Sequence, residues 1–196
     1  MIGSDSVKNI NVGFALTGSF CTFGKAVAQI ELLKKAGANI IPIMSFNACS
    51  TDTRFGKAGD FINRIEAITG NKIISTIVDA EPIGPKNLTD ILIVLPCSGN
   101  TLAKLASGIY DTPVTLAVKS HLRNQKPVVI GVSSNDSLSA SAKNIGALLN
   151  YKHYYFIPMR QDDPIKKPFS IVCDFDKTIE SAELALNGKQ IEPIIF

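Results

Sequence analysis

Short apolar runs alternate along this chain with longer segments of helical periodicity, and this alternation constrains the fold more than any other feature. The runs are INVGFAL near Ile10, NIIPIM near Asn39, DILIVL near Asp90, PVVIGV near Pro127 and YYFIP near Tyr154. Their length and branched residues are typical of buried strands, and strands separated by helices favour a parallel sheet. We therefore predict an open doubly wound parallel α/β sheet of the Rossmann or flavodoxin type, in a single domain over residues 1–196.

The segments between the runs have the spacing of amphipathic helices. In FGKAVAQIELLKKAG the apolar residues Val27, Ile30 and Leu33 recur at helical intervals, and Gly37 suits a left-handed helix cap. Further helices are predicted over residues 53–70, 101–110, 111–124, 137–150 and 176–189, with a loop over residues 160–168. Ligands of such sheets bind beyond the carboxyl ends of the strands, so function is expected in the loops that follow them.

Composition narrows the class of protein. The chain has 20 Lys and Arg against 17 Asp and Glu, and no basic run is interleaved with aromatic residues, so nucleic acid is not an expected partner. The four cysteines lack Cys-x-x-Cys spacing, and residues 1–13 lack a charged segment followed by a long apolar one. The apolar runs are far shorter than the ~20 residues of a membrane span. We expect a reduced cytoplasmic protein without a membrane segment.

The stretch IVCDFDKTI resembles the first motif of haloacid-dehalogenase-type phosphatases, with Asp174 as nucleophile and Asp176 as acid. That chemistry also needs a Ser or Thr, a Lys and further acids from later loops. Acids beyond Thr178 are Glu180, Glu183 and Glu192. The first two lie in a helical run whose apolar residues need burial in the core. A permuted order of the phosphatase motifs that uses Asp162 and Asp163 is conceivable, but the segment QDDPIKKP is equally typical of a turn. We predict that Asp174 and Asp176 are solvated at a helix start, where carboxylates complement the dipole.

Small polar residues follow the first two predicted strands. Gly18 and Ser19 stand between the first strand and its helix, where backbone N–H groups and a hydroxyl suit a phosphate, although a tight turn with an N-cap explains them too. The glycine spacing is not Gly-x-Gly-x-x-Gly, and no acid ends the second strand, so dinucleotide binding is disfavoured. Ser45 and Asn47 stand there instead.

The same character continues after the third and fourth strands. The third ends in PCSGNTLAKLASGIYD, a polar elbow before a helix of small residues, and the fourth ends in GVSSNDS. Hydroxyls and amides therefore follow four successive strands with almost no charge. This suits a neutral, flat ring joined to one phosphate.

The segments GFALTGSF, PCSGNTLAKLASGIYD and PVVIGVSSN resemble the flavoprotein superfamily that includes FMN-containing cysteine decarboxylases and flavin prenyltransferases. The resemblance implies FMN as cofactor. The implied binding residues are Thr17, Gly18, Ser19, Ser45, Ser98, Gly99, Asn100, Thr101, Ser134 and Asn135. Gly18, Ser19 and Ser98 would bind the phosphate, and Ser134 and Asn135 end the segment that matches the superfamily's Pro-Ala-Met-Asn. Residues assigned to the phosphate, ribityl chain or ring edge are Ser45, Asn100 and Thr101.

Two activities of the superfamily fit less well. The decarboxylases use a His after the second strand, and residues 50–70 contain none; His121 and His153 are expected to have surface or packing roles. The prenyltransferases have Lys where this chain has Asn100, and their Arg-Glu-Thr-Pro stretch is replaced by SSNDS. A flavin prenyltransferase or decarboxylase therefore stays an alternative.

The runs STDTRFG, AEPIGPK, SSNDSL and YYFIPMRQDDPIKKP resemble the flavin-binding B subunits of a two-subunit oxidoreductase within this superfamily. The resemblance implies oxidation of a small dicarboxylate together with an A subunit that carries NAD(P), and a homo-oligomer such as a trimer or dodecamer. Candidate cations for the dicarboxylate are Arg54, Lys57, Lys119, Arg123 and Arg160. A third hypothesis is a non-catalytic scaffold that holds FMN. No catalytic residue or metal ligand is identified.

Overall fold

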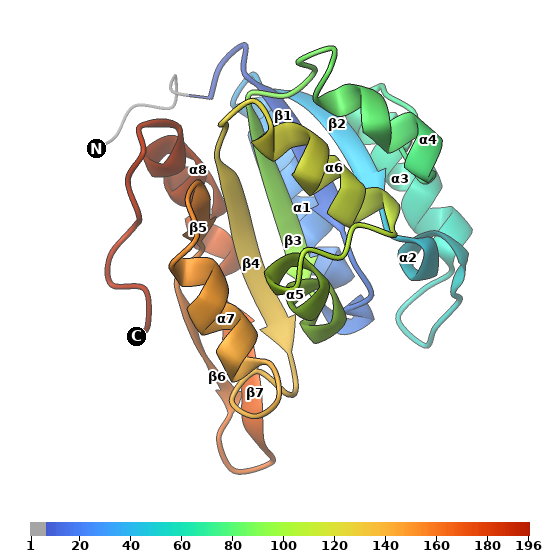
Figure 1. Cartoon of the computed structure of the whole chain (residues 1–196). Coiled ribbons are helices and arrows are strands. Elements are labelled where there is room, and N and C mark those ends of the chain that lie inside the picture. Colours follow the sequence, from blue (N-terminus) through green and yellow to red (C-terminus); the bar gives the residue numbers. More distant parts are fainter. Residues whose placement is uncertain (1–6) are drawn as a thin grey trace.

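Five parallel strands form the centre of the molecule in a computed structural model that describes residues 7–196 (Figure 1). They are β1 (Asn11–Leu16), β2 (Asn39–Met44), β3 (Ile91–Cys97), β4 (Val128–Ser134) and β5 (Tyr154–Phe156). The order across the sheet is β2-β1-β3-β4-β5, and each neighbouring pair is parallel. The predicted doubly wound α/β sheet is confirmed. Residues 1–6, which belong to the predicted domain and N-terminal segment, lie outside the described residues.

Both faces of the sheet are buried, which explains the nearly continuous apolar runs. In β3, Ile91, Ile93 and Leu95 point into one core cluster, while Leu92 and Val94 point into the other. Successive side chains of a strand alternate between its faces, so one run of apolar residues supplies both clusters. These residues are fully buried.

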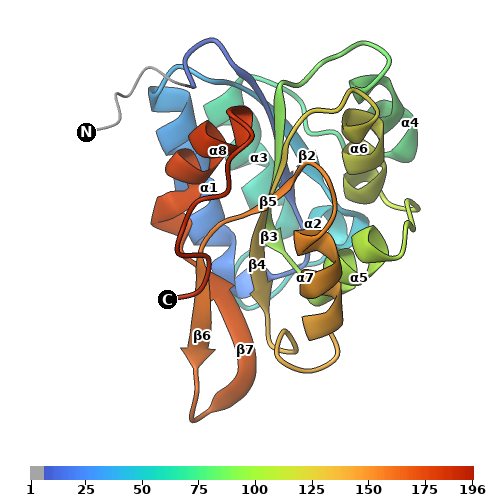
Figure 2. The same ribbon diagram turned by 60° about the vertical axis from the view of Figure 1, so that its left-hand side comes forward.

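Helices cover the two faces in separate groups (Figure 2). Those against one face are α1 (Phe23–Lys35), α3 (Ala58–Thr69) and α8 (Thr178–Leu186). Those against the other are α4 (Ile77–Ala80), α5 (Gly99–Ala106), α6 (Pro113–Leu122) and α7 (Ala142–Leu149). The short α2 (Phe46–Ser50) follows β2. Among residues 7–196, no helix has both the length and the apolar character needed to cross a membrane.

An antiparallel hairpin extends the sheet beyond β4 and projects from the body of the molecule (Figures 1 and 2). Its strands β6 (Met159–Asp163) and β7 (Lys167–Cys173) pair with each other, and β7 also pairs antiparallel with β4 through Val172 and Ile171. The loop predicted over residues 160–168 is therefore wrong except at residues 164–166, which form the turn of the hairpin. Most of β6 is exposed, so its polar side chains give none of the apolar alternation by which a half-buried strand is detected.

Several predicted helices are shorter in the structure, and α3 begins only at Ala58 rather than at residue 53. Helix α5 ends at Ala106 rather than at residue 110, and Gly108 then adopts a left-handed conformation with φ of 69°. Helix α7 begins only at Ala142 rather than at residue 137, because serine hydroxyls bond to nearby backbone carbonyls and hold turns there. The Ser137 hydroxyl donates to the Ser134 carbonyl at 3.1 Å, and the Ser139 hydroxyl to the Asp136 carbonyl at 3.0 Å.

Candidate functional site

A cavity of about 820 Å³ lies at the carboxyl ends of β1, β3 and β4. After β1 the chain enters α1 against one face of the sheet, and after β3 it enters α5 against the other face. The sheet order therefore changes direction between β1 and β3, and a crevice opens there. Ligands of open α/β sheets bind at such a point, as FMN does in flavodoxin, which has the same 2-1-3-4-5 order. The lining residues used below are Gly18, Ser19, Lys25, Arg54, Ser98, Gly99, Asn100, Ser133, Ser134, Asn135, Asp136, Asp162 and Lys167.

The loop after β1 carries hydroxyl groups that form hydrogen bonds with the end of β4. Ser19 Oγ lies 2.9 Å from Ser133 Oγ, and Thr22 Oγ1 donates to the Ser19 carbonyl at 2.9 Å. A short 3-10 helix, η1 (Phe20–Thr22), separates this turn from α1. Gly18 and Ser19 therefore lie at the cavity wall as the sequence predicted, and Ser133 joins them across the crevice.

Thr17 fastens β1 to β3 behind this wall. It is buried, its hydroxyl donates to the Pro96 carbonyl at 2.8 Å, and the same oxygen accepts from the Ser98 N–H at 2.9 Å. Thr17 is not among the lining residues of the cavity. Its hydrogen bonds hold the two strand ends at the spacing that the crevice requires.

The end of β3 presents the first turn of α5 to the cavity. Ser98 is the N-cap, and its hydroxyl accepts from the Thr101 N–H at 3.4 Å. Gly99 and Asn100 line the cavity, whereas Thr101 is buried in the helix with Oγ1 3.3 Å from Ser98 Oγ. The unpaired N–H groups and positive dipole end of a helix favour an anionic group at this position.

Ser45 lies outside the cavity. Its hydroxyl caps α2 by accepting from the Ala48 N–H at 3.3 Å, and it is not a lining residue. Of the predicted binding residues, the structure brings together Gly18, Ser19, Ser98, Gly99, Asn100, Ser134 and Asn135 in one cavity wall. Those left outside the wall are Thr17, Ser45 and Thr101.

Asp136 is a site residue that the sequence argument did not identify. Its Oδ1 accepts from Ser134 Oγ at 2.5 Å and its Oδ2 from Ser141 Oγ at 2.9 Å. A Cβ added at Gly99 would lie only 2.5 Å from Asp136 Oδ1, so the carboxylate occupies the space that glycine leaves. Because Ser134 donates its hydrogen to Asp136, its oxygen can offer only lone pairs to a ligand. The sequence feature that could have identified Asp136 is its position directly after Asn135, a residue already assigned to the site.

The β6–β7 hairpin forms a further wall of the cavity, which the sequence argument missed with the hairpin itself. Asp162 and Lys167 line it and form an ion pair of 2.6 Å, and that carboxylate raises the pKa of Lys167. Ser170 lies further along β7, buried at the same wall. The pairing of β7 with Ser133 and Ser134 of β4 holds the hairpin at this side of the cavity.

Two cations at the cavity have no ion-pair partner among residues 7–196. Lys25 Nζ lies 5.8 Å from the Phe175 ring centre, and the Arg54 guanidinium lies 4.9 Å from that of Phe55. Arg54 was one of the predicted cations, and Lys25 was not. The other predicted cations, none of which lines this cavity, are Lys57, Lys119, Arg123 and Arg160.

The phosphatase-like stretch has no site around it. Asp174 caps the 3-10 helix η3 (Phe175–Lys177) by accepting from the Asp176 N–H at 3.2 Å, and Asp176 is exposed. Neither residue lines the cavity, and the described part of the chain holds no cluster of three His, Cys, Asp or Glu side chains suited to a metal ion. The prediction of residues at a helix start is confirmed.

His121 is a buried structural residue, as the sequence argument expected. Its Nδ1 lies 2.7 Å from Thr89 Oγ1 and its Nε2 3.0 Å from the Pro127 carbonyl. The carbonyl can only accept, so Nε2 carries the proton and Nδ1 accepts from Thr89. Burial lowers the pKa of His121 to about 4.

Comparison with known proteins identifies the class first. A protein-family model described as flavoprotein matches residues 2–185, so the chain belongs to the flavoprotein family. Within it the chain is similar to the B subunit of dipicolinate synthase from Bacillus subtilis (strain 168), with 43% identity over 190 residues that cover 97% of this chain and 95% of that protein. The predicted resemblance is therefore confirmed.

Solved structures agree with this assignment. The crystal structure of the dipicolinate synthase B subunit from Bacillus halodurans C is 40% identical, covers 97% of each chain and superposes with a TM-score of 0.89. The FMN-dependent cysteine decarboxylase SpaF, at 21% identity, superposes with a TM-score of 0.69 over 92% of this chain and 99% of that chain. The second likeness shows the shared fold.

Proposed function

We propose that this chain is the FMN-binding B subunit of a dipicolinate synthase. With an A subunit that carries NAD(P), it would oxidise a dihydrodipicolinate-type precursor to the aromatic dicarboxylate dipicolinate during sporulation, in the cytoplasm. The observation that carries the proposal is the hydroxyl-lined crevice between β1 and β3 in a chain 43% identical to such a B subunit along nearly its whole length. A homo-oligomer, trimeric or dodecameric, belongs to the same proposal.

The cavity wall fits FMN in its chemistry and space. Its volume of about 820 Å³ lies in the range of cofactor and ligand pockets. Gly18, Ser19 and Ser98, at the turn after β1 and the start of α5, would hold the phosphate with N–H groups and hydroxyls. Near the ring, Ser134 would accept a hydrogen bond from an N–H group, because its own hydrogen is held by Asp136. Asn135 and Asn100 add exposed amides.

Charges at the same cavity suit a dicarboxylate substrate. Arg54 and Lys25 line it without ion-pair partners in the described part of the chain, and each could pair with one carboxylate. Aromatisation of a dihydropyridine removes a hydride and a proton, and FMN, when bound, would supply the hydride acceptor. In this enzyme role the substrate hydride passes to FMN. If the nicotinamide of the A subunit takes the hydride directly, this chain is instead a scaffold that only holds FMN.

Titration with FMN tests the cofactor. We expect saturable binding and a flavin absorption band, and binding of NAD with none of FMN would contradict the proposal. Ser98→Ala combined with Asn100→Ala should weaken FMN binding by roughly threefold to tenfold for each hydrogen bond lost. The matched control, Ser50→Ala with Asn150→Ala, changes exposed residues away from the cavity and should leave binding unchanged.

Activity assays of each chain alone and of the mixture test the partnership. This chain alone should make little dipicolinate, and addition of the A subunit should permit nicotinamide-dependent oxidation. The Ser98 and Asn100 variant should lower that rate in parallel with FMN occupancy. Loss of FMN with unaltered output would assign the flavin a structural role, and full turnover by this chain alone would refute the two-subunit proposal.

A further inference from the structure

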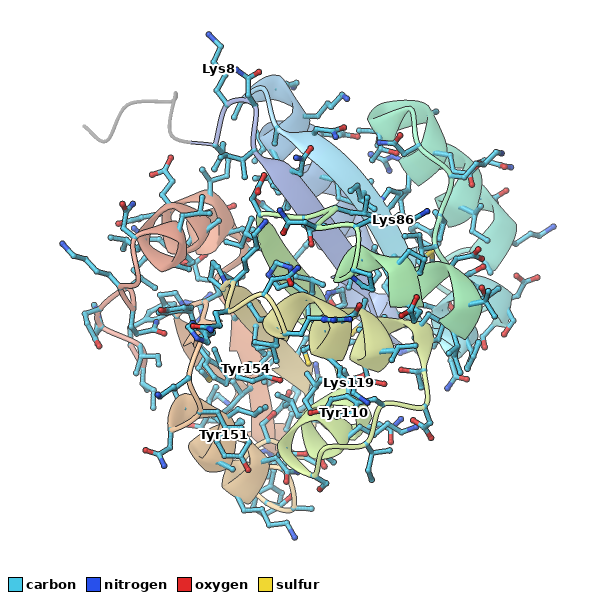
Figure 3. All side chains as sticks on the ribbon, turned by 45° about the horizontal axis from the view of Figure 1, so that its top comes forward. Lys8, Lys86, Tyr110, Lys119, Tyr151 and Tyr154 are labelled. Atoms are coloured by element: carbon cyan, nitrogen blue, oxygen red, sulfur yellow. The ribbon has the colours of Figure 1, made fainter. Side chains whose placement is uncertain are left out.

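A second cavity of about 570 Å³ lies at the far end of α5 from the crevice. Its walls come from the last turn of α5, from Tyr110 and Leu122, and from residues 151–154 at the start of β5. None of its lining residues is shared with the first cavity, although α5 begins in one and ends in the other. We call it the tyrosine pocket, because Tyr110, Tyr151 and Tyr154 line it (Figure 3).

Tyr154 supplies a hydroxyl donor that reaches the surface of the pocket. The residue is only 9% exposed, yet its hydroxyl makes no hydrogen bond within residues 7–196. Burial, followed by the neighbouring Tyr110, raises the pKa of the Tyr154 phenol, so the group stays protonated and donates. The Tyr154 hydroxyl is not one of the buried side-chain atoms left without a partner in the described residues, so it faces the pocket and is open to a ligand or to water.

The acceptors at this end of α5 are already used. N–H groups of the following loop bond to the last carbonyls of the helix: Ser107 to Ala103 at 3.0 Å, Ile109 to Lys104 at 2.8 Å and Gly108 to Leu105 at 3.3 Å. The Tyr151 hydroxyl donates to the remaining carbonyl, that of Ala106, at 3.2 Å. The pocket therefore offers a donor and aromatic faces, and no free helix carbonyl competes for the donor.

The charge around the tyrosine pocket is positive. Lys152 lines it, and no Asp or Glu is among its lining residues. Lys119 Nζ lies 5.2 Å from the Tyr110 ring centre, and Figure 3 shows these two side chains next to each other. The ring centres of Tyr151 and Tyr154 lie 6.4 Å apart at 58°. Tyr154 is buried, whereas Tyr151 is 46% exposed, so the Tyr151 ring is the one of this pair that is available for stacking.

We propose that the tyrosine pocket binds a small planar aromatic carboxylate. The ligand ring would stack on the exposed ring of Tyr151, and its carboxylate would accept from the Tyr154 hydroxyl and pair with Lys152. The tyrosine pocket shares no lining residue with the proposed FMN site, so binding there requires neither FMN nor the proposed oxidation. A cation is disfavoured by the lysines, and an aliphatic acid would lose the stacking.

Calorimetric titration of the full chain with benzoate tests the proposal. We expect a dissociation constant on the order of 1 mM, as for a fragment of this size. Cyclohexanecarboxylate, which keeps the charge but lacks the flat ring, and benzyltrimethylammonium, which keeps the ring but reverses the charge, should both bind at least several-fold more weakly. Tyr154→Phe should weaken benzoate binding about tenfold, because it removes one hydrogen bond to a charged group.

Tyr155→Phe is the matched control, since it removes a neighbouring hydroxyl that does not line the pocket, and its affinity should equal that of the unaltered chain. The proposal is overturned if the titration gives no heat and equilibrium dialysis confirms that benzoate does not bind. It is equally overturned if all three probes bind with the same affinity, or if Tyr154→Phe leaves the affinity for benzoate unaltered. It is also overturned if Tyr151→Glu dissociates an assembly of this chain in sedimentation, because a second copy would then cover the pocket.

Discussion

Replacing Gly99 by Ala should disrupt the carboxylate cluster that borders the proposed flavin site. The new Cβ would lie 2.5 Å from Asp136 Oδ1 and 2.8 Å from both Ser134 Oγ and Ser141 Oγ. These distances are shorter than any ordinary carbon–oxygen contact, so Asp136 must move and its two hydrogen bonds must break or lengthen. The variant therefore perturbs the position of Ser134 without removing a single polar group from the site.

The magnitude follows from the contacts. A hydrogen bond to a charged group contributes about 1.5–3 kcal/mol, and overpacking costs about 1–3 kcal/mol. Partial relaxation and the better helix propensity of Ala, about 1 kcal/mol, offset part of this, so we expect a net loss of roughly 1–3 kcal/mol. For a chain of this size that lowers the thermal midpoint by roughly 2–12 °C. FMN binding should weaken about tenfold as Ser134 and the start of α5 shift.

Gly146→Ala is the matched control for Gly99→Ala. Gly146 is also helical, in α7, and no atom lies within 4 Å of the position of its added Cβ. Helix propensity alone should then act and raise the stability by about 0.5–1 kcal/mol, with FMN binding unchanged. Thermal melting and FMN titration of both variants give the comparison. Equal stability changes in the two variants, or unaltered FMN affinity in Gly99→Ala, would refute the role assigned to the cluster.

Three further predictions concern other residues. His121 has a pKa of about 4 in the folded chain and about 6.5 in the unfolded chain. Between these pH values the unfolded state binds more protons than the folded state, so the free energy of unfolding falls as the pH falls. We expect a loss on the order of 3 kcal/mol between pH 6.5 and pH 4. Denaturant unfolding against pH checks this, and His121→Gln should flatten that window. Asp174→Asn should leave the activity of the intact complex nearly unchanged, and magnesium-dependent phosphate release that disappears in this variant would restore the phosphatase hypothesis. Arg54→Ala should raise KM for the dicarboxylate without changing FMN affinity, and equal effects on both would assign Arg54 to the cofactor.

Much of the crevice was predictable because it follows strand ends. In a parallel sheet all carboxyl ends meet at one edge, so Ser19, Ser98 and Ser134 were placed together by strand positions alone. The order of the strands decides where that edge opens, and here the opening falls between β1 and β3. Ser45 also follows a strand, yet it lies outside the cavity and caps α2 instead.

The five parallel strands, the order of the βα units and the neutral polar character of the loops could be predicted from the sequence, because burial on both faces of a sheet leaves apolar runs that can be recognised locally. Which side chains meet across the chain depends instead on tertiary packing. Strand β6 and the turn after it are mostly exposed and so carry no burial pattern, and Asp136 gains its role from the space at Gly99, a residue distant in sequence. Likewise the tyrosine pocket joins Tyr110 to Tyr154 through the packing of α5, α6 and the segment before β5. Contacts between residues far apart in sequence depend on how helices and strands pack together, so the local spacing of hydrophobic residues does not predict them.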